Sequence, residues 1–143
     1  MSAFRPDGWT TPELAQAVER GQLELHYQPV VDLRSGGIVG AEALLRWRHP
    51  TLGLLPPGQF LPVVESSGLM PEIGAWVLGE ACRQMRDWRM LAWRPFRLAV
   101  NVSASQVRPD FDGWVKGVLA DAELPAEYLC HFQKTTAPIV RSR

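Results

Sequence analysis

Cysteine and net charge are both scarce in this sequence of 143 residues. The only cysteines, Cys82 and Cys130, lie far apart and form no paired-ligand spacing, so neither a disulfide framework nor a structural zinc site is predicted. We expect both to be reduced thiols. Fifteen Lys and Arg residues balance fifteen Asp and Glu residues. This neutrality removes the electrostatic argument for a nucleic-acid polymer or an anionic membrane as a partner.

Long hydrophobic runs are missing as well. The first ten residues, MSAFRPDGWT, lack the apolar core of a signal peptide, and no uninterrupted apolar run approaches the roughly 18 residues of a membrane span. We therefore expect a cytoplasmic protein with no membrane partner. Hydrophobic residues nevertheless make up 46% of the chain, and its length suits one core better than two, so a single globular unit is predicted.

Hydrophobic periodicity predicts alternating strands and helices. Turn residues from Asp32 to Gly37 join the first two strands into an antiparallel hairpin, and Pro29 favours an edge position for the first of them. Residues 49–62 are rich in proline and glycine and predict a long shaped loop. This order favours a parallel α/β architecture, either an open doubly wound sheet or a barrel. We expect strands at 23–31, 38–47, 97–103 and 128–133, and helices from Thr10 or Thr11 to Gly21 and at 60–66, 73–88 and 111–123.

The second predicted strand carries two charges on one face. Strand parity places Gly40, Glu42, Leu44 and Arg46 on that face, and the apolar residues at odd positions 39–47 on the other. One interpretation is an internal ion pair, because buried charges are usually paired. The other is a metal-binding carboxylate beside a phosphate clamp, since hard cations favour carboxylate oxygen and the arginine fork matches phosphate.

Two amides are further candidates. Asn101 lies among apolar residues of the third strand, where an unpaired buried amide would cost about 1 to 3 kcal/mol. It is either a satisfied structural amide or a metal ligand. Gln28, near the end of the first strand, is either a solvated residue or a ligand contact. No zinc-triad spacing of histidines, nucleophile elbow or phosphate-binding glycine loop is present.

Three segments in order resemble the EAL domain family of cyclic di-GMP phosphodiesterases. They are Tyr27-Gln28-Pro29-Val30-Val31, then Gly40-Ala41-Glu42-Ala43-Leu44-Leu45-Arg46-Trp47, then Asn101-Val102-Ser103. The resemblance implies a TIM-like (β/α)8 barrel with an antiparallel first strand, of which about four of the eight strands are present, and a ligand at the carboxyl ends of the strands. It divides the chain into an N-terminal extension (1–10), the N-terminal half of an EAL domain (11–129) and a divergent tail (130–143).

The resemblance also implies roles for the candidate residues. Glu42 and Asn101 would be metal ligands, Arg46 would contact a phosphate, and Gln28 and Leu44 would form part of the nucleotide-binding floor. The implied metal is Mg²⁺ or Mn²⁺, which activates a water that opens one phosphodiester of cyclic di-GMP and gives linear pGpG.

The resemblance stops after Leu129. Residues 130–143 contain no acidic residue, whereas the family continues with further acidic ligands and a lysine. We therefore expect a truncated or frameshifted chain that is inactive alone, with its open barrel edge covered by a homodimer or a partner protein. The alternatives are a degenerate, non-catalytic EAL module that binds nucleotide or protein, and a remnant with no independent function.

Overall fold

The structure is a computed structural model, and it describes residues 8–91, 97–102, 110–123, 125 and 129–134. The predicted alternation of strands and helices is confirmed. The first helix ends earlier than expected, and a short strand and a 3-10 turn occupy the predicted loop. In chain order the elements are α1 (Thr11–Gln16), β1 (Leu23–Val31), β2 (Ile38–His49), β3 (Gly53–Leu55), η1 (Pro57–Gln59), α2 (Leu61–Ser66), α3 (Met70–Leu91), β4 (Arg97–Val102), α4 (Phe111–Asp121) and β5 (Leu129–Lys134).

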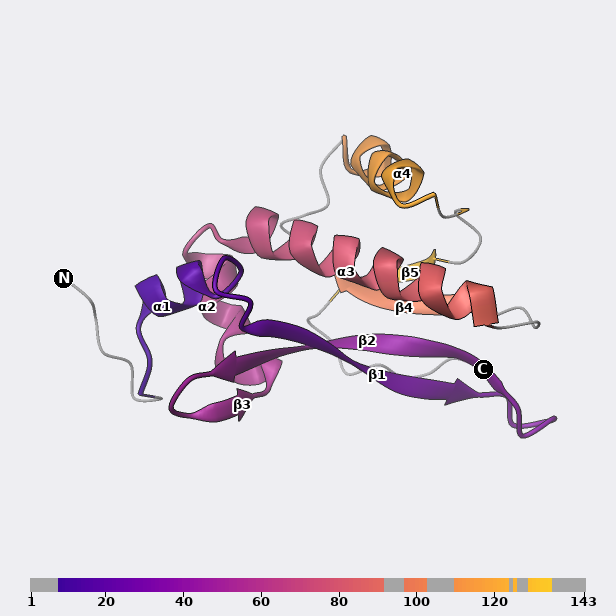
Figure 1. Cartoon of the computed structure of the whole chain (residues 1–143), viewed down its shortest axis with the longest axis horizontal. Helices are drawn as coiled ribbons and strands as arrows, with labels where there is room; N and C mark the ends of the chain where they lie inside the picture. Colours follow the sequence, from indigo (N-terminus) through magenta and orange to yellow (C-terminus); the bar gives the residue numbers. More distant parts are fainter. Residues whose placement is uncertain (1–7, 92–96, 103–109, 124, 126–128, 135–143) are drawn as a thin grey trace.

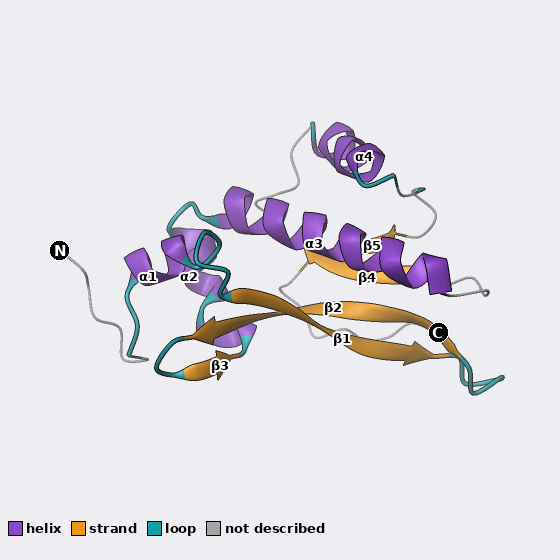
Figure 2. Ribbon diagram, viewed as in Figure 1, coloured by secondary structure: helices purple, strands orange, loops and turns teal. Residues whose placement is uncertain are grey.

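The strands form one mixed sheet in the order β1-β2-β4-β5, with β3 paired to β2 beside this path. β1 runs antiparallel to β2, whereas β2, β4 and β5 are parallel (Figure 2). The predicted hairpin is therefore confirmed. Pro29 lies in β1, at an edge of the described sheet, where a residue without an N–H group is tolerated.

Helix α3 lies along one face of the sheet, and α4 lies on the far side of α3 (Figure 1). The apolar side of α3, which the periodicity predicted, packs against the strands. Ala81 and Met85 on this side are fully buried. One core cluster joins the sheet to both helices: Ala41, Ala43, Leu78, Ala81, Cys82, Met85, Leu98, Val100, Val115 and Leu119. This core packs one face of β2 and β4 against the helices. The other face of the two strands points away from α3.

A second core holds the carboxyl end of β2. Trp47 is fully buried, and its ring meets Trp9, His49 and Phe60 edge to face at centroid distances of 5.2, 5.1 and 5.9 Å. Its indole Nε1 donates a hydrogen bond to Gln22 Oε1 at 3.1 Å. Aromatic side chains bury large areas in such contacts, so the end of β2 is fixed against the α1 and η1 region.

Helix α1 is tied to the same end of β2. Thr10 and Glu13 form a capping box, in which Glu13 Oε2 accepts from Thr10 N at 2.6 Å and Glu13 N donates to Thr10 Oγ1 at 3.3 Å. The other carboxylate oxygen lies 3.5 Å from Nε2 of buried His49. The Thr10 backbone hydrogen bond is the largest of the effects that lower the pKa of Glu13. One carboxylate thus connects the helix cap to the strand end.

Strands β2 and β4 approach each other closely at Gly40. Gly40 pairs with Arg97 in the parallel ladder, and a Cβ at Gly40 would collide with the Arg97 carbonyl oxygen. That oxygen belongs to the backbone, so it cannot swing aside as a side chain would. A glycine is therefore required for the two strands to pair in this register.

Candidate functional site

The two faces of β2 differ in burial as strand parity predicted. Ala41 and Ala43 are buried beneath the helices, whereas Glu42, Leu44 and Arg46 are half-buried on the opposite face. The predicted separation of faces is confirmed. The candidate residues of β2 therefore lie on the side of the sheet that α3 does not cover.

Gln28 lies directly opposite Glu42 in the antiparallel ladder. Directly opposed residues share a face of the sheet, and their Cβ atoms lie about 4.5 to 5.5 Å apart. Gln28 is exposed and Glu42 is half-buried. The structure thus makes cross-strand neighbours of two residues that were predicted separately from two strands.

Leu44 and Arg46 continue the same face toward the carboxyl end of β2. Nη1 of Arg46 donates a hydrogen bond to the Leu45 carbonyl at 2.9 Å. Within the described part of the chain, Arg46 forms no ion pair, so the internal Glu42–Arg46 pair considered above is not found. No carboxylate of the described residues therefore neutralises the charge of Arg46 through an ion pair.

Three further polar residues, Glu24, His26 and Arg48, line this face and were not singled out from the sequence. Arg48 donates two hydrogen bonds to the Glu24 carboxylate, from Nη2 to Oε1 at 2.7 Å and from Nε to Oε2 at 3.3 Å. His26 Nε2 lies 3.0 Å from the same Oε1. These contacts lower the pKa of Glu24, and the Arg48 hydrogen bond is the largest cause. Positions 24 and 26 have the same strand parity as Gln28, so these residues share its face of the hairpin. Applying strand parity to the first strand would have identified them from the sequence.

Asn101 lies in β4 near the candidate residues of β2. It follows Ala99 by two positions, and Ala99 is the register partner of Glu42. In β5, Gln133 is the partner of Asn101. The predicted third strand is therefore confirmed, and it pairs with β2. The side chain of Asn101 lies outside the described part of the structure, and its role as a metal ligand stays a prediction.

A divalent cation needs more oxygen ligands than the described residues bring together. Mg²⁺ and Ca²⁺ take about six or more oxygens. The described residues include no group of three or more His, Cys, Asp and Glu side chains that could hold a metal ion. Glu42 offers a carboxylate and Gln28 an amide oxygen across the ladder. The described residues therefore do not supply a full coordination sphere for such a cation.

The antiparallel first strand, the parallel strands after it and the covering helices define an α/β protein of the barrel type. The family model "EAL domain" matches residues 12–132. The chain belongs to the EAL domain family.

Two similar relatives come from Pseudomonas aeruginosa. The bifunctional diguanylate cyclase/cyclic di-GMP phosphodiesterase MucR is 56% identical over 94 residues, which cover 66% of this chain and 14% of MucR. The cyclic di-GMP phosphodiesterase NbdA is 42% identical over 118 residues, which cover 82% of this chain and 15% of NbdA. The chain thus spans a small part of each of these longer relatives.

Solved structures show the same fold. The PaMucR phosphodiesterase in its c-di-GMP complex matches with a TM-score of 0.79 and 48% identity, over 82% of this chain and 48% of that one. The FimX EAL domain of P. aeruginosa bound to c-di-GMP matches with a TM-score of 0.70 and 31% identity, over 82% of this chain and 47% of that one. The predicted fold class, a partial (β/α)8 barrel of EAL type, is confirmed.

Across the described residues, no helix combines the length and the apolar character needed to cross a membrane. The cytoplasmic location and the division of the chain at residues 10 and 129 stay predictions.

Proposed function

We propose that this chain forms one wall of a metal-dependent cyclic di-GMP phosphodiesterase site. In this proposal Glu42 and Asn101 are ligands of Mg²⁺ or Mn²⁺, Arg46 contacts a phosphate, and Gln28 and Leu44 contact the nucleotide. The observation that carries the proposal is the placement of Gln28 opposite Glu42, on the face where Arg46 has no ion-pair partner among the described residues.

The chemistry of this face suits a cyclic dinucleotide. A guanidinium binds phosphate through two parallel N–H bonds, and the Leu44 side chain offers apolar surface between the charges of Glu42 and Arg46. A ligand with anionic phosphates and flat bases uses both kinds of group. The names of MucR and NbdA and the two c-di-GMP complexes support this choice of ligand.

A binding measurement tests the nucleotide contacts. We expect calorimetric titration with cyclic di-GMP to show weak binding, because one wall of a pocket buries little of the ligand. Arg46→Gln should weaken binding further. Arg83→Gln is the matched control, since Arg83 is held by Glu80 and Asp87 on α3. Equal affinities for Arg46→Gln and the unchanged protein would contradict the phosphate role.

A hydrolysis assay tests whether this wall suffices for catalysis. Two-metal hydrolysis needs ligands on both ions, and Glu42 belongs to no group of three or more acidic, histidine or cysteine side chains among the described residues. We therefore propose that the 143-residue chain is inactive alone. The expected result is no pGpG in the presence of Mg²⁺ or Mn²⁺. Metal-dependent pGpG formation that Glu42→Ala abolishes would overturn this part of the proposal.

We also propose that another chain, either a second copy or a partner protein, covers an edge of the sheet. β1 and β5 end the described strand order, and exposed strand edges favour pairing with another chain. Sedimentation velocity should show self-association or, with a partner, a hetero-complex. A stable monomer that binds no other chain would contradict this proposal.

A further inference from the structure

Glu24 is bonded to the more distant of two arginines. Its direct partner in the β1–β2 ladder is Arg46, yet its carboxylate is held by Arg48, which is diagonal to it. Directly opposed Cβ atoms lie about 4.5 to 5.5 Å apart, whereas diagonal neighbours lie about 7 to 8 Å apart. Arg48 nevertheless forms both bonds of a fork, at 2.7 and 3.3 Å. His26 adds a third contact to Glu24, at 3.0 Å.

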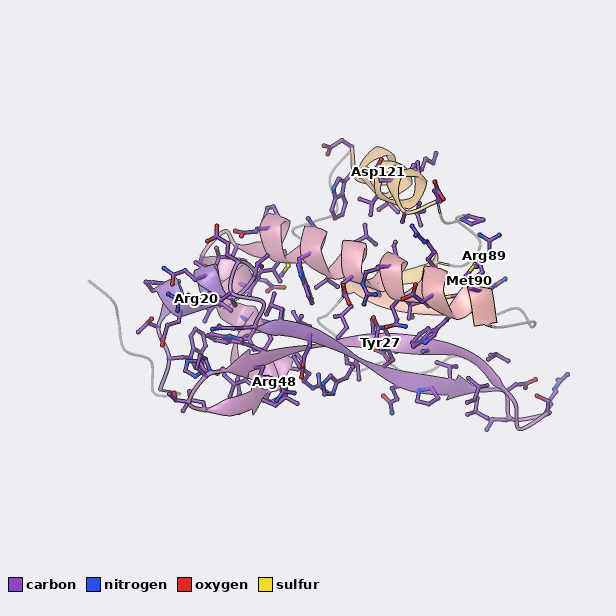
Figure 3. All side chains as sticks on the ribbon, in the orientation of Figure 1. Arg20, Tyr27, Arg48, Arg89, Met90 and Asp121 are labelled. Atoms are coloured by element: carbon purple, nitrogen blue, oxygen red, sulfur yellow. The ribbon has the colours of Figure 1, made fainter. Side chains whose placement is uncertain are left out.

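The consequence falls on Arg46. If Glu24 bonded to the residue opposite it, its negative charge would neutralise the guanidinium that the proposed site needs. Instead, the side chain of Arg46 turns to the Leu45 carbonyl. Figure 3 shows Arg48 on the side of the hairpin away from α3, whereas Tyr27 lies on the side toward α3. Arg48 and Arg46 share this side, because their positions have the same strand parity.

We propose that Arg48 is a positioning residue that holds Glu24 away from Arg46 and so keeps the Arg46 guanidinium for a phosphate of the ligand. This inference rests on the proposed phosphate role of Arg46. The Glu24 carboxylate would compete with a ligand phosphate for Arg46, and its bonds to Arg48 prevent this competition. The lowered pKa of Glu24 is consistent with this arrangement, because an ionised carboxylate accepts both hydrogen bonds from Arg48.

The size of the effect follows from the exposure of these groups. Arg48 is 62% and Glu24 33% exposed at the side chain, and exposed ion pairs contribute little because water and salt screen them. Release of Glu24 toward Arg46 is therefore expected to weaken phosphate binding by about twofold to fivefold. The effect should shrink at high ionic strength.

A double-substitution experiment tests the inference. The Nε–Hε signals of the arginines are recorded by NMR without ligand, and cyclic di-GMP is then titrated so that weak binding remains measurable. Arg48→Gln should shift the Arg46 signal and weaken binding. Glu24→Gln combined with Arg48→Gln should return both to the values of the unchanged protein. Arg48→Lys keeps the charge and should give an intermediate result, and Arg83→Gln, a forked arginine on α3, should change neither.

The readouts separate this inference from the proposed function. If Arg46→Gln weakens binding but Arg48→Gln does not, Arg48 has no positioning role. Weaker binding by Arg48→Gln that is not restored in the double variant has the same meaning, because Glu24 would not be the cause. If Arg46→Gln leaves binding unchanged, the phosphate role of Arg46 fails, and the inference falls with it. An Arg46 signal that does not respond to Arg48→Gln overturns the inference directly, whatever the ligand affinity. Amide spectra of each variant confirm that the sheet is intact.

Discussion

Gln28 and Glu42 face each other across the β1–β2 ladder. This pairing places the Gln28 amide beside the Glu42 carboxylate on the face of the sheet that α3 does not cover. The carboxylate gives this part of the face a negative charge. The charge balance at this point can be changed with one substitution, without touching the core beneath α3.

Gln28→Glu should destabilise the protein. It places a second carboxylate directly opposite Glu42, and like charges at opposed positions destabilise a sheet, on the scale of the about 0.2 to 1 kcal/mol that favourable cross-strand pairs contribute. Urea unfolding at low ionic strength measures the change. If the face binds a divalent cation, Mg²⁺ should recover part of the loss. Gln28→Lys is the control of opposite charge, and equal free energies of unfolding for the two variants would contradict the expectation.

Gly40→Ala should destabilise the protein through the β2–β4 pair. The added Cβ meets the backbone carbonyl oxygen of Arg97, and overpacking of this kind costs about 1 to 3 kcal/mol. Gly79→Ala in α3 is the matched control, because nothing lies within 4 Å of its added Cβ and alanine favours the helix. Chemical unfolding of both variants checks the difference. Equal loss of stability in both would show that β2 and β4 do not approach as closely as described.

Thr10→Ala should loosen α1. It removes the hydroxyl that accepts from Glu13 N, and loss of an N-cap side chain costs about 0.5 to 2 kcal/mol. Thermal unfolding measures the loss. Thr10→Ser retains the hydroxyl and should restore most of the stability. A Ser variant as unstable as the Ala variant would argue that the capping bond contributes nothing.

Stability should fall at alkaline pH. Burial raises the pKa of the Cys82 thiol from 9.0 to about 11. Burial, with a smaller contribution from Glu80, raises the pKa of the Tyr27 hydroxyl from 10.0 to about 12. Both groups hold their protons more tightly when folded, so their contribution is complete below pH 9 and is lost as the pH rises toward 12.

The alkaline effect can be assigned to its two groups. In Cys82→Ala, the free energy of unfolding should lose the part of its pH dependence that begins near 9, and keep the part that begins near 10. Denaturant unfolding at a series of pH values records both curves. An unchanged pH dependence in the Cys82 variant would contradict the raised pKa of the thiol.

The sequence predicted β1 and β2 well, because the alternation of apolar and polar residues and the Asp32–Gly37 turn both indicate an antiparallel hairpin, which the structure contains. It missed β3, whose pairing of Leu55 with Trp47 is a tertiary contact that a three-residue segment cannot signal. It also extended α1 to Gly21, whereas the helix ends at Gln16 and turns follow it. Local periodicity carries no information about where such turns begin.

The candidate site divides in the same way. Strand parity put Glu42, Leu44 and Arg46 on one face, and burial confirms this. The Glu24–Arg48 bond could not be predicted, because it joins diagonal positions of two strands, whereas the direct register partner of Glu24 is Arg46. Parity determines which residues share a face. It does not determine which of two nearby cations a carboxylate selects.

We propose that cyclic di-GMP binds the face of the hairpin that carries Glu42 and Arg46. Titration of the ligand into the isotope-labelled protein with Mg²⁺, monitored through the backbone amide signals, tests this binding. We predict progressive shifts at Gln28 and from Glu42 to Arg46, with none at Arg83, an exposed residue of α3. Shifts confined to the helices would contradict the proposed binding face. The absence of hairpin shifts at ligand concentrations that saturate shifts in other parts of the protein would contradict it as well.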